Sequence, residues 1–134
     1  MTEKTLETFL LRRLRDIGFL AEKISLNNSP GIPDILISRN LKSLMIEIKI
    51  CNKNTTLEKL FRPSQISYMI QNFGKIKIGC IIDYDGVFIY FEPTKYILRE
   101  ASKRTILDII TTYPNYFECH KISGMINYIN EANK

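Results

Sequence analysis

Apolar residues recur at helical spacing at the start of the chain, and short runs rich in β-branched residues follow further along. The first pattern predicts an amphipathic helix over residues 3–17, which Gly18 would end. Its inner stripe consists of Leu6, Phe9, Leu10, Leu14 and Ile17. Runs of strand character lie at 19–25, 35–37, 44–48, 75–82 and 87–91, and helical patterns lie at 57–61 and 63–73. This order predicts an α/β fold in which helices flank a central mixed β-sheet.

The C-terminal part of the chain has a mostly helical pattern. We expect a helix over 95–113, a short strand over 117–122 and a last helix over 123–133. A chain of 134 residues is long enough for a real hydrophobic core but too short for a second unit. We therefore expect one domain over 1–134, with a core over about 3–91 and a C-terminal extension over about 92–134.

Two of the strand runs are separated by a polar, turn-like segment, which predicts an antiparallel hairpin. With the turn centred on Asn40-Leu41, Asp34 lies directly opposite Glu47, and Lys49 follows on the same face. A slip of one residue would move Asp34 to the other face, so this register is a prediction that a structure can test.

Glu47 and Lys49 lie within an otherwise apolar run, where unpaired charges are costly to bury. Each of these residues, taken singly, suits an exposed strand or a turn. Together they indicate a site, because two carboxylates this close repel each other unless a cation joins them. Oxygen ligands of this kind suit a hard divalent cation, and Mg²⁺ typically takes one or two carboxylates together with a substrate phosphate.

The charge of the chain favours an anionic partner. The formal net charge is +5 and the isoelectric point is about 9.1. Basic residues concentrate on the first helix and after the strand that carries Lys49, where they would flank the proposed metal site. They either form a solvated surface or line a groove that follows a phosphate backbone, and we favour the groove. The candidates for binding nucleic acid are Arg12, Arg13, Lys53, Lys59 and Arg62.

Other classes of site find no support in the sequence. The cysteines, Cys51, Cys80 and Cys119, have neither zinc-site spacing nor a disulfide pattern, which favours a reducing, cytoplasmic compartment. His120 is the single histidine, and nothing near it suggests a catalytic triad. The sequence contains no phosphate-binding glycine loop, no signal peptide and no apolar stretch long enough to span a membrane.

The motif Pro33-Asp34, followed by Glu47-Ile48-Lys49, resembles the PD-(D/E)XK nuclease superfamily. The preceding helix with Glu7 and the following helix with Gln65 extend the resemblance over about residues 3–91, in an order similar to the VRR-NUC branch and the archaeal-type Holliday junction resolvases. Residues 92–134 match nothing in these families. The resemblance implies a restriction-endonuclease-like αβββαβ core.

The resemblance also implies the roles of the site residues. Asp34 and Glu47 would hold Mg²⁺, or Mn²⁺ in its place, with the backbone carbonyl of Ile48 as a further ligand. Lys49 would stabilise the charge on the phosphate. Glu7 would reach the metal, or is simply a favourable acid near the start of a helix. Gln65 would hold a phosphate or water, or is simply a polar residue in the first turn of its helix.

The implied function is metal-dependent endonucleolytic cleavage of branched DNA, as in Holliday junction resolution during recombination. Two alternatives stay open: a nickase, flap or restriction-type endonuclease of other specificity, and a non-catalytic nucleic-acid-binding module on the same fold. Because paired incisions need two active sites, we expect a homodimer. Its interface would use apolar residues of the C-terminal segment, although packing of these residues against their own sheet is the alternative. They are Ile106, Ile109, Ile110, Tyr113, Tyr116, Phe117, Ile122, Met125, Ile126 and Ile129.

Overall fold

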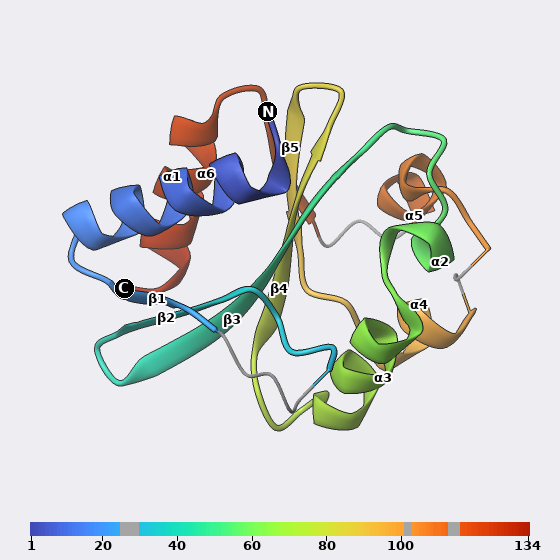
Figure 1. Cartoon of the computed structure of the whole chain (residues 1–134), viewed down its shortest axis with the longest axis horizontal. Coiled ribbons are helices and arrows are strands. Elements are labelled where there is room, and N and C mark those ends of the chain that lie inside the picture. Colours follow the sequence, from blue (N-terminus) through green and yellow to red (C-terminus); the bar gives the residue numbers. More distant parts are fainter. Residues whose placement is uncertain (25–29, 101–102, 113–115) are drawn as a thin grey trace.

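The computed structural model of the chain describes residues 1–24, 30–100, 103–112 and 116–134, and a six-stranded β-sheet lies at its centre (Figure 1). The strands lie side by side in chain order. Neighbouring strands are antiparallel except β3 and β4, which are parallel. Their bounds are β1 (Leu20–Lys23), β2 (Ile35–Arg39), β3 (Lys42–Cys51), β4 (Ile78–Tyr84), β5 (Val87–Phe91) and β6 (Tyr116–Cys119).

Helices cover both faces of this sheet (Figure 1). Helices α1 (Glu3–Asp16) and α6 (Ile122–Ala132) pack on one face, where Leu6, Leu10 and Leu14 of α1 and alternate residues of β2 and β3 form one core cluster. The prediction that Phe9 belongs to the inner stripe of α1 is wrong, because its side chain is 38% exposed. The other face carries α2 (Leu57–Leu60), α3 (Pro63–Asn72), α4 (Lys95–Glu100) and α5 (Ile106–Thr112), which enclose a second cluster. The predicted α/β class, with a mixed sheet between helices, is confirmed. Among the described helices, none is long and apolar enough to cross a membrane.

The hairpin that joins β2 to β3 has the predicted register. Ile35 pairs with Ile46, and Arg39 pairs with Lys42, so the turn consists of Asn40 and Leu41. Both turn residues have positive φ, 55° and 65°, as a tight turn between twisted antiparallel strands requires. Continuing the register by one residue sets Asp34 opposite Glu47, as expected.

The predicted long helix over 95–113 is wrong, because the structure has two shorter helices, α4 and α5, in this region. Thr105 lies between them and forms an isolated antiparallel bridge with Thr56, which holds it in an extended conformation. Its side-chain oxygen accepts a hydrogen bond from the backbone N–H of Asp108 and so caps the start of α5. The first strand is also shorter than predicted, and the end of that prediction, Ser25, lies outside the described residues.

The apolar stripes of the C-terminal segment lie within the core of their own chain. Ile106, Ile109 and Ile110 are buried against the α2–α5 face, and Met125, Ile126 and Ile129 are buried against the α1 face. Tyr116, Phe117 and Ile122 are partly buried beside these clusters, and Tyr113 is not among the described residues. Intramolecular packing, the alternative to an interface, therefore accounts for these stripes. The homodimer stays a prediction, and these stripes do not identify its interface.

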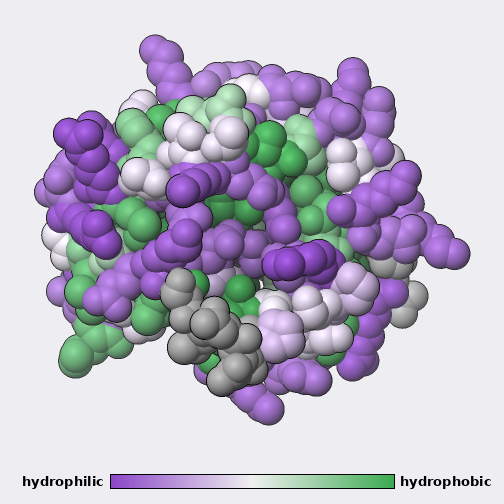
Figure 2. Space-filling view, in the orientation of Figure 1, coloured by the Kyte–Doolittle hydropathy of each residue, from purple (hydrophilic) through white to green (hydrophobic). Residues whose placement is uncertain are grey.

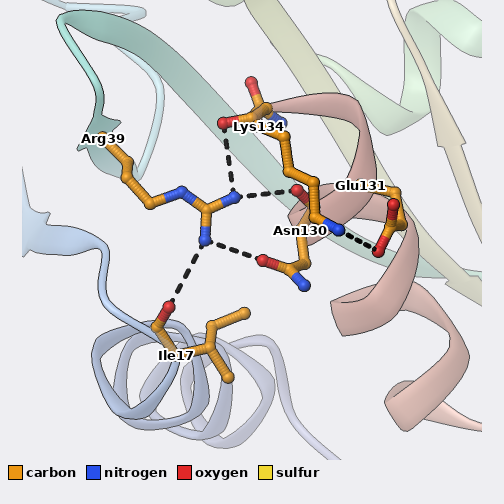
Figure 3. Close-up of polar contacts among 6 residues, drawn as sticks. Ile17, Arg39, Asn130, Glu131 and Lys134 are labelled. Carbon is orange, nitrogen blue, oxygen red and sulfur yellow. Dashed lines mark hydrogen bonds and ion pairs between the residues drawn. The ribbon is translucent and has the colours of Figure 1, made fainter.

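The side chain of Arg39, at the hairpin turn, forms hydrogen bonds at the C-terminal ends of two helices (Figure 3). The guanidinium of Arg39 donates to the backbone carbonyl of Ile17 after α1, at 3.3 Å, and to the side-chain oxygen of Asn130 in α6, at 2.7 Å. It also donates to the backbone carbonyls of Asn130 and Asn133, at 2.8 and 3.3 Å. A cation is favourable here because the last carbonyls of a helix lack partners within the helix.

Arg39→Lys is expected to destabilise the fold by about 1–3 kcal/mol, because an ammonium cannot reproduce the fork of planar donors. It also loses the stacking of the guanidinium on Phe19, whose ring centre lies 4.0 Å away. Thermal unfolding measures the effect, with Arg99→Lys on the exposed surface as the matched control. Equal melting temperatures for the two variants would contradict this role of Arg39.

Candidate active site

Two acidic side chains meet where β2 begins beside β3. The carboxylate of Asp34 accepts a hydrogen bond from the backbone N–H of Ile48, at 2.8 Å, which fixes it beside β3. Glu47 is 2% exposed and alternates along β3 with Ile46 and Ile48, which belong to the α1-side core. Glu47 therefore lies on the opposite face of the strand from these isoleucines. The hairpin register thus holds both carboxylates together, as the sequence predicted.

The surroundings of Glu47 oppose its ionisation. Burial raises its pKa above the ordinary value of 4.5, and a hydrogen bond and the negative charge of Asp34 raise it further. The ammonium of Lys49 lowers the pKa by less than these effects raise it. A buried carboxyl pair of this kind is stabilised by whatever supplies positive charge, either a proton or a bound cation.

A cavity of about 450 Å³ opens over this pair and gathers most of the candidate residues. Its lining contains both acidic and basic side chains, so it is strongly polar. Its lining consists of Glu3, Lys4, Glu7, Lys23, Asp34, Glu47, Ile48, Lys49, Arg62 and Gln65. A larger cavity, of about 940 Å³, has mainly apolar walls such as Met69, Phe91 and Ile109, and Glu92 is the one acid among its described lining residues. The acidic side chains that could bind a metal therefore gather at the smaller cavity.

Helix α1 brings Glu7 into this cavity. Glu7 is buried, and its Oε1 has no hydrogen-bond partner among the described residues. The ammonium of Lys23 lies 3.7 Å from this oxygen. Burial raises the pKa of Glu7, Lys23 lowers it, and the negative charge of Asp34 raises it again. A buried carboxylate oxygen without a hydrogen-bond donor, close to a second acid, suits an additional ligand or water contact to a cation.

The side chain of Lys49 follows Glu47 on the same face of β3 and is partly exposed. Its ammonium lies over the ring of Phe61, 5.7 Å from the ring centre. Phe61 is 1% exposed, so the ring forms a rigid apolar wall that limits where the ammonium can lie. Lys49 is thereby placed at the rim of the cavity beside the carboxylates.

Gln65 has a structural role, and it also lines the cavity. Its side-chain carbonyl accepts a hydrogen bond from the backbone N–H of Arg62, at 2.9 Å, and so caps the start of α3. This hydrogen bond fixes the orientation of the amide and leaves its NH₂ group available as a donor. Gln65 is 3% exposed, so its position is well defined. The two roles that the sequence left open for Gln65 are therefore compatible.

A close backbone contact holds α3 against the segment that leads into Asp34. Gly31 has φ of 88°, a conformation that favours glycine, and a Cβ atom there would overlap the backbone carbonyl of Ser64. The contact sets the distance between Gln65 and the carboxylate pair.

Gly31→Ala is expected to destabilise the protein by about 3 kcal/mol or more, because overlap with backbone adds to the left-handed conformational penalty of about 1–2 kcal/mol. Gly74→Ala isolates that penalty, since Gly74 has φ of 80° and nothing within 4 Å of an added Cβ. Chemical denaturation compares the two variants. If Gly31→Ala were no more destabilising than Gly74→Ala, the contact with α3 would not be a tight one.

The donor set fits a divalent cation held mainly by two carboxylates. No group of three or more acidic, cysteine or histidine side chains is close enough to form a complete metal cage in the part of the chain that the structure describes. Asp34 and Glu47 nevertheless offer adjacent oxygens, and burial and mutual repulsion raise the pKa of Glu47 by more than Lys49 lowers it, which is the chemistry that Mg²⁺ or Mn²⁺ suits. Ile48 lines the same cavity, and its N–H already serves Asp34.

The basic candidates do not all lie at the cavity. Arg62 lines it, and Lys53 and Lys59 are exposed on the segment between β3 and Arg62. Arg12 and Arg13 are exposed on the C-terminal half of α1, where the guanidinium of Arg13 lies 5.9 Å from the ring centre of Phe9. Hydrophilic side chains cover much of the face seen in Figure 1, interrupted by smaller hydrophobic areas (Figure 2).

Three charged residues that line the cavity are not among the site residues predicted from the sequence. They are Glu3, Lys4 and Lys23. Lys23 ends β1 opposite Ile35, directly beside Asp34 in the sheet. The signal for it was available, because a strand that pairs antiparallel with β2 must end near Asp34. Glu3 accepts a hydrogen bond from the backbone N–H of Ile50, at 3.4 Å, a contact that the helical pattern alone does not reveal.

Comparison with known proteins gives structural similarity but no sequence match. No protein-family profile matches the sequence, and no curated protein sequence matches it. The structure is similar to that of Hjc from Archaeoglobus fulgidus, described as a Holliday junction resolvase from an archaeal hyperthermophile. The TM-score is 0.41 and the sequence identity 19%, over 63% of this chain and 74% of that one. The side chains that line the cavity, rather than this similarity, define the chemistry of the site.

Proposed function

We propose that this protein is a Mg²⁺-dependent endodeoxyribonuclease of the PD-(D/E)XK type that acts on branched DNA. The observation that carries this proposal is the position of Asp34 and Glu47, whose carboxylates lie together beside Lys49 in one polar cavity. The hairpin register, which the structure shows as predicted, places these two residues opposite each other.

The cavity is suited to a phosphodiester. Its lining includes the cations Lys4, Lys23, Lys49 and Arg62 as well as the acids, so the cations could bind the phosphate of a strand while the acids hold a metal. The formal net charge of +5 favours the approach of a polyanion to the protein as a whole. These features support a nucleic acid rather than a neutral substrate.

Asp34 and Glu47 would hold the metal, with the backbone carbonyl of Ile48 as a further oxygen, and Glu7, which forms no three-acid cluster with them in the described part of the chain, would contact it through water. When bound, the metal would lower the pKa of a water molecule and neutralise charge on the phosphate. Lys49, held against Phe61, would stabilise the negative charge that develops on the scissile phosphate. The amide NH₂ of Gln65 would orient the attacking water or a phosphate oxygen, since its carbonyl is engaged in the helix cap.

Branched DNA is the substrate class that the sequence resemblance favours. A four-way junction has two strands to cut at symmetry-related positions, so two copies of the chain would act on it together. The other endonuclease specificities, and a binding module without activity, are tested by the same experiment.

The experiment is a cleavage assay with four-way junction, flap and linear duplex DNA of matched sequence, in Mg²⁺, Mn²⁺ or EDTA. We expect cleavage with either metal, none in EDTA, and a preference for the junction. Preferential cleavage of flap or linear DNA would reassign the specificity. Binding without cleavage of any substrate would contradict the proposed enzyme and favour the binding module.

A further inference from the structure

The C-terminal extension is joined by backbone hydrogen bonds to the segment that follows the candidate catalytic strand. The backbone N–H of Leu57 donates to the carbonyl of Arg104, at 3.0 Å, and the N–H of Ile106 donates to the carbonyl of Thr55, at 2.9 Å. These bonds flank the isolated bridge between Thr56 and Thr105. The segment before α2 and the segment before α5 therefore form a short two-stranded unit, near which α2 and α5 lie side by side (Figure 1).

This bridge joins two segments that are distant in the sequence and that both carry exposed basic residues. Lys103 and Arg104 precede Thr105, Lys53 precedes Thr56, and Lys59 lies on α2, and all four side chains are exposed. We refer to these four residues as the bridge surface. No member of it forms an ion pair with another described side chain, and the exposed acids on the same two segments are Glu58 and Asp108. The two joined segments therefore carry four exposed cations against two exposed acids.

The bridge surface lies close to the candidate active site. Helix α2 starts directly after Thr56 and is followed by Phe61 and Arg62, and Arg62 lines the cavity. Arg62 is six positions after Thr56, and Phe61 and Arg62 have extended backbones, so a short stretch of chain connects the bridge to the cavity.

We propose that the bridge surface is a second contact for the phosphate backbone of a DNA duplex, through which the C-terminal extension positions the arm next to the scissile bond. The proposal rests on the proposed function and adds to it a binding role for Lys103 and Arg104. The main-chain bridge joins the backbone segments that carry these cations. A duplex, whose phosphates keep a regular spacing, suits cations on a fixed backbone better than a flexible single strand does.

The test is the salt dependence of duplex binding by Lys103→Ala/Arg104→Ala. The bridge should persist, because Arg104 contributes its backbone carbonyl rather than its side chain. Loss of two phosphate contacts should lower the slope of log affinity against log salt by about 2 and weaken binding about tenfold or more near 0.1 M salt.

The control, Lys42→Ala/Lys134→Ala, removes the same charge at the hairpin turn and the C-terminal end, far from α2 and α5 (Figure 1). It should leave the slope unchanged. Equal slopes for the test variant and the wild type, equal losses in test and control variants, or a loss confined to single-stranded DNA would each overturn the bridge-surface proposal. Failure of the wild type to cleave DNA, with the slope effect intact, would instead contradict the proposed enzyme.

Discussion

Asp34→Asn is expected to abolish Mg²⁺-dependent cleavage, lowering the cleavage rate by about 10³-fold or more. The change replaces a metal-binding carboxylate with a neutral amide of almost the same shape. The amide oxygen can still accept the hydrogen bond from the N–H of Ile48, so the hairpin should keep its register. Single-turnover cleavage of a four-way junction measures the loss.

Two measurements separate loss of chemistry from loss of structure. The variant should bind junction DNA in Ca²⁺ with nearly the affinity of the wild type, because Ca²⁺ supports looser coordination without productive cleavage. The control Asp16→Asn removes an acid from the exposed end of α1 and should retain full activity. Unchanged cleavage by Asp34→Asn would rule out the assigned site.

Glu47→Gln is expected to abolish cleavage and, in the absence of metal, to stabilise the fold. Burial and the adjacent Asp34 raise the pKa of Glu47, so the folded protein holds this proton more tightly than the unfolded chain. As the pH rises above the ordinary value of 4.5, the unfolded chain loses its proton first. The wild type therefore loses stability toward neutral and alkaline pH, whereas glutamine carries no such proton. The stabilisation by glutamine should thus grow as the pH rises.

Thermal unfolding in EDTA at pH 5 and pH 8 measures this difference. At pH 8 we expect the Glu47→Gln variant to be more stable by about 1 kcal/mol or more, which corresponds to a melting temperature higher by about 3–5 °C. Adding Mg²⁺ should stabilise the wild type alone, because the variant lacks a ligand. Glu58→Gln, on the exposed side of α2, serves as the control. If the wild type is at least as stable as Glu47→Gln in EDTA at pH 8, the acid pair does not lower the stability of the metal-free fold.

These two predictions describe one trade-off. In the metal-free protein, the carboxyl pair is expected to lower the free energy of unfolding. The hydrogen bond from Ile48 nevertheless holds Asp34 in place, and the ring of Phe61 does the same for Lys49. Buried groups that lower stability in this way are common at functional sites, where they are retained for the chemistry that they support.

The local parts of this fold follow from the sequence. The helical stripe from Leu6 to Ile17 correctly predicts α1, because burial along one face leaves a period that the sequence displays directly. The turn at Asn40-Leu41 fixes which residues of β2 and β3 are opposite each other, since a two-residue turn leaves a single register. The pairing of Asp34 with Glu47, and the position of Lys49 beside them, follow from that register alone.

The tertiary structure decided which surface each apolar stripe covers. The stripes around Ile109 and Ile126 were read as a possible interface, but they face their own sheet. A helical period shows that one face is buried without showing what buries it. The break between α4 and α5 likewise depends on Thr56, which lies far away in the sequence and pairs with Thr105.

The hairpin and the acid pair are thus predictable from the sequence, because both arise from neighbours joined by a tight turn. Three other features appear only once the elements are packed. Lys23 and Glu3 share the cavity of the acid pair, the carbonyl of Gln65 caps α3 while the residue lines the same cavity, and Lys103 and Arg104 lie beside the segment following β3. These contacts join residues from separate elements, and their formation depends on how the helices pack on the two faces of the sheet. Local propensity and periodicity carry no information about such non-local packing.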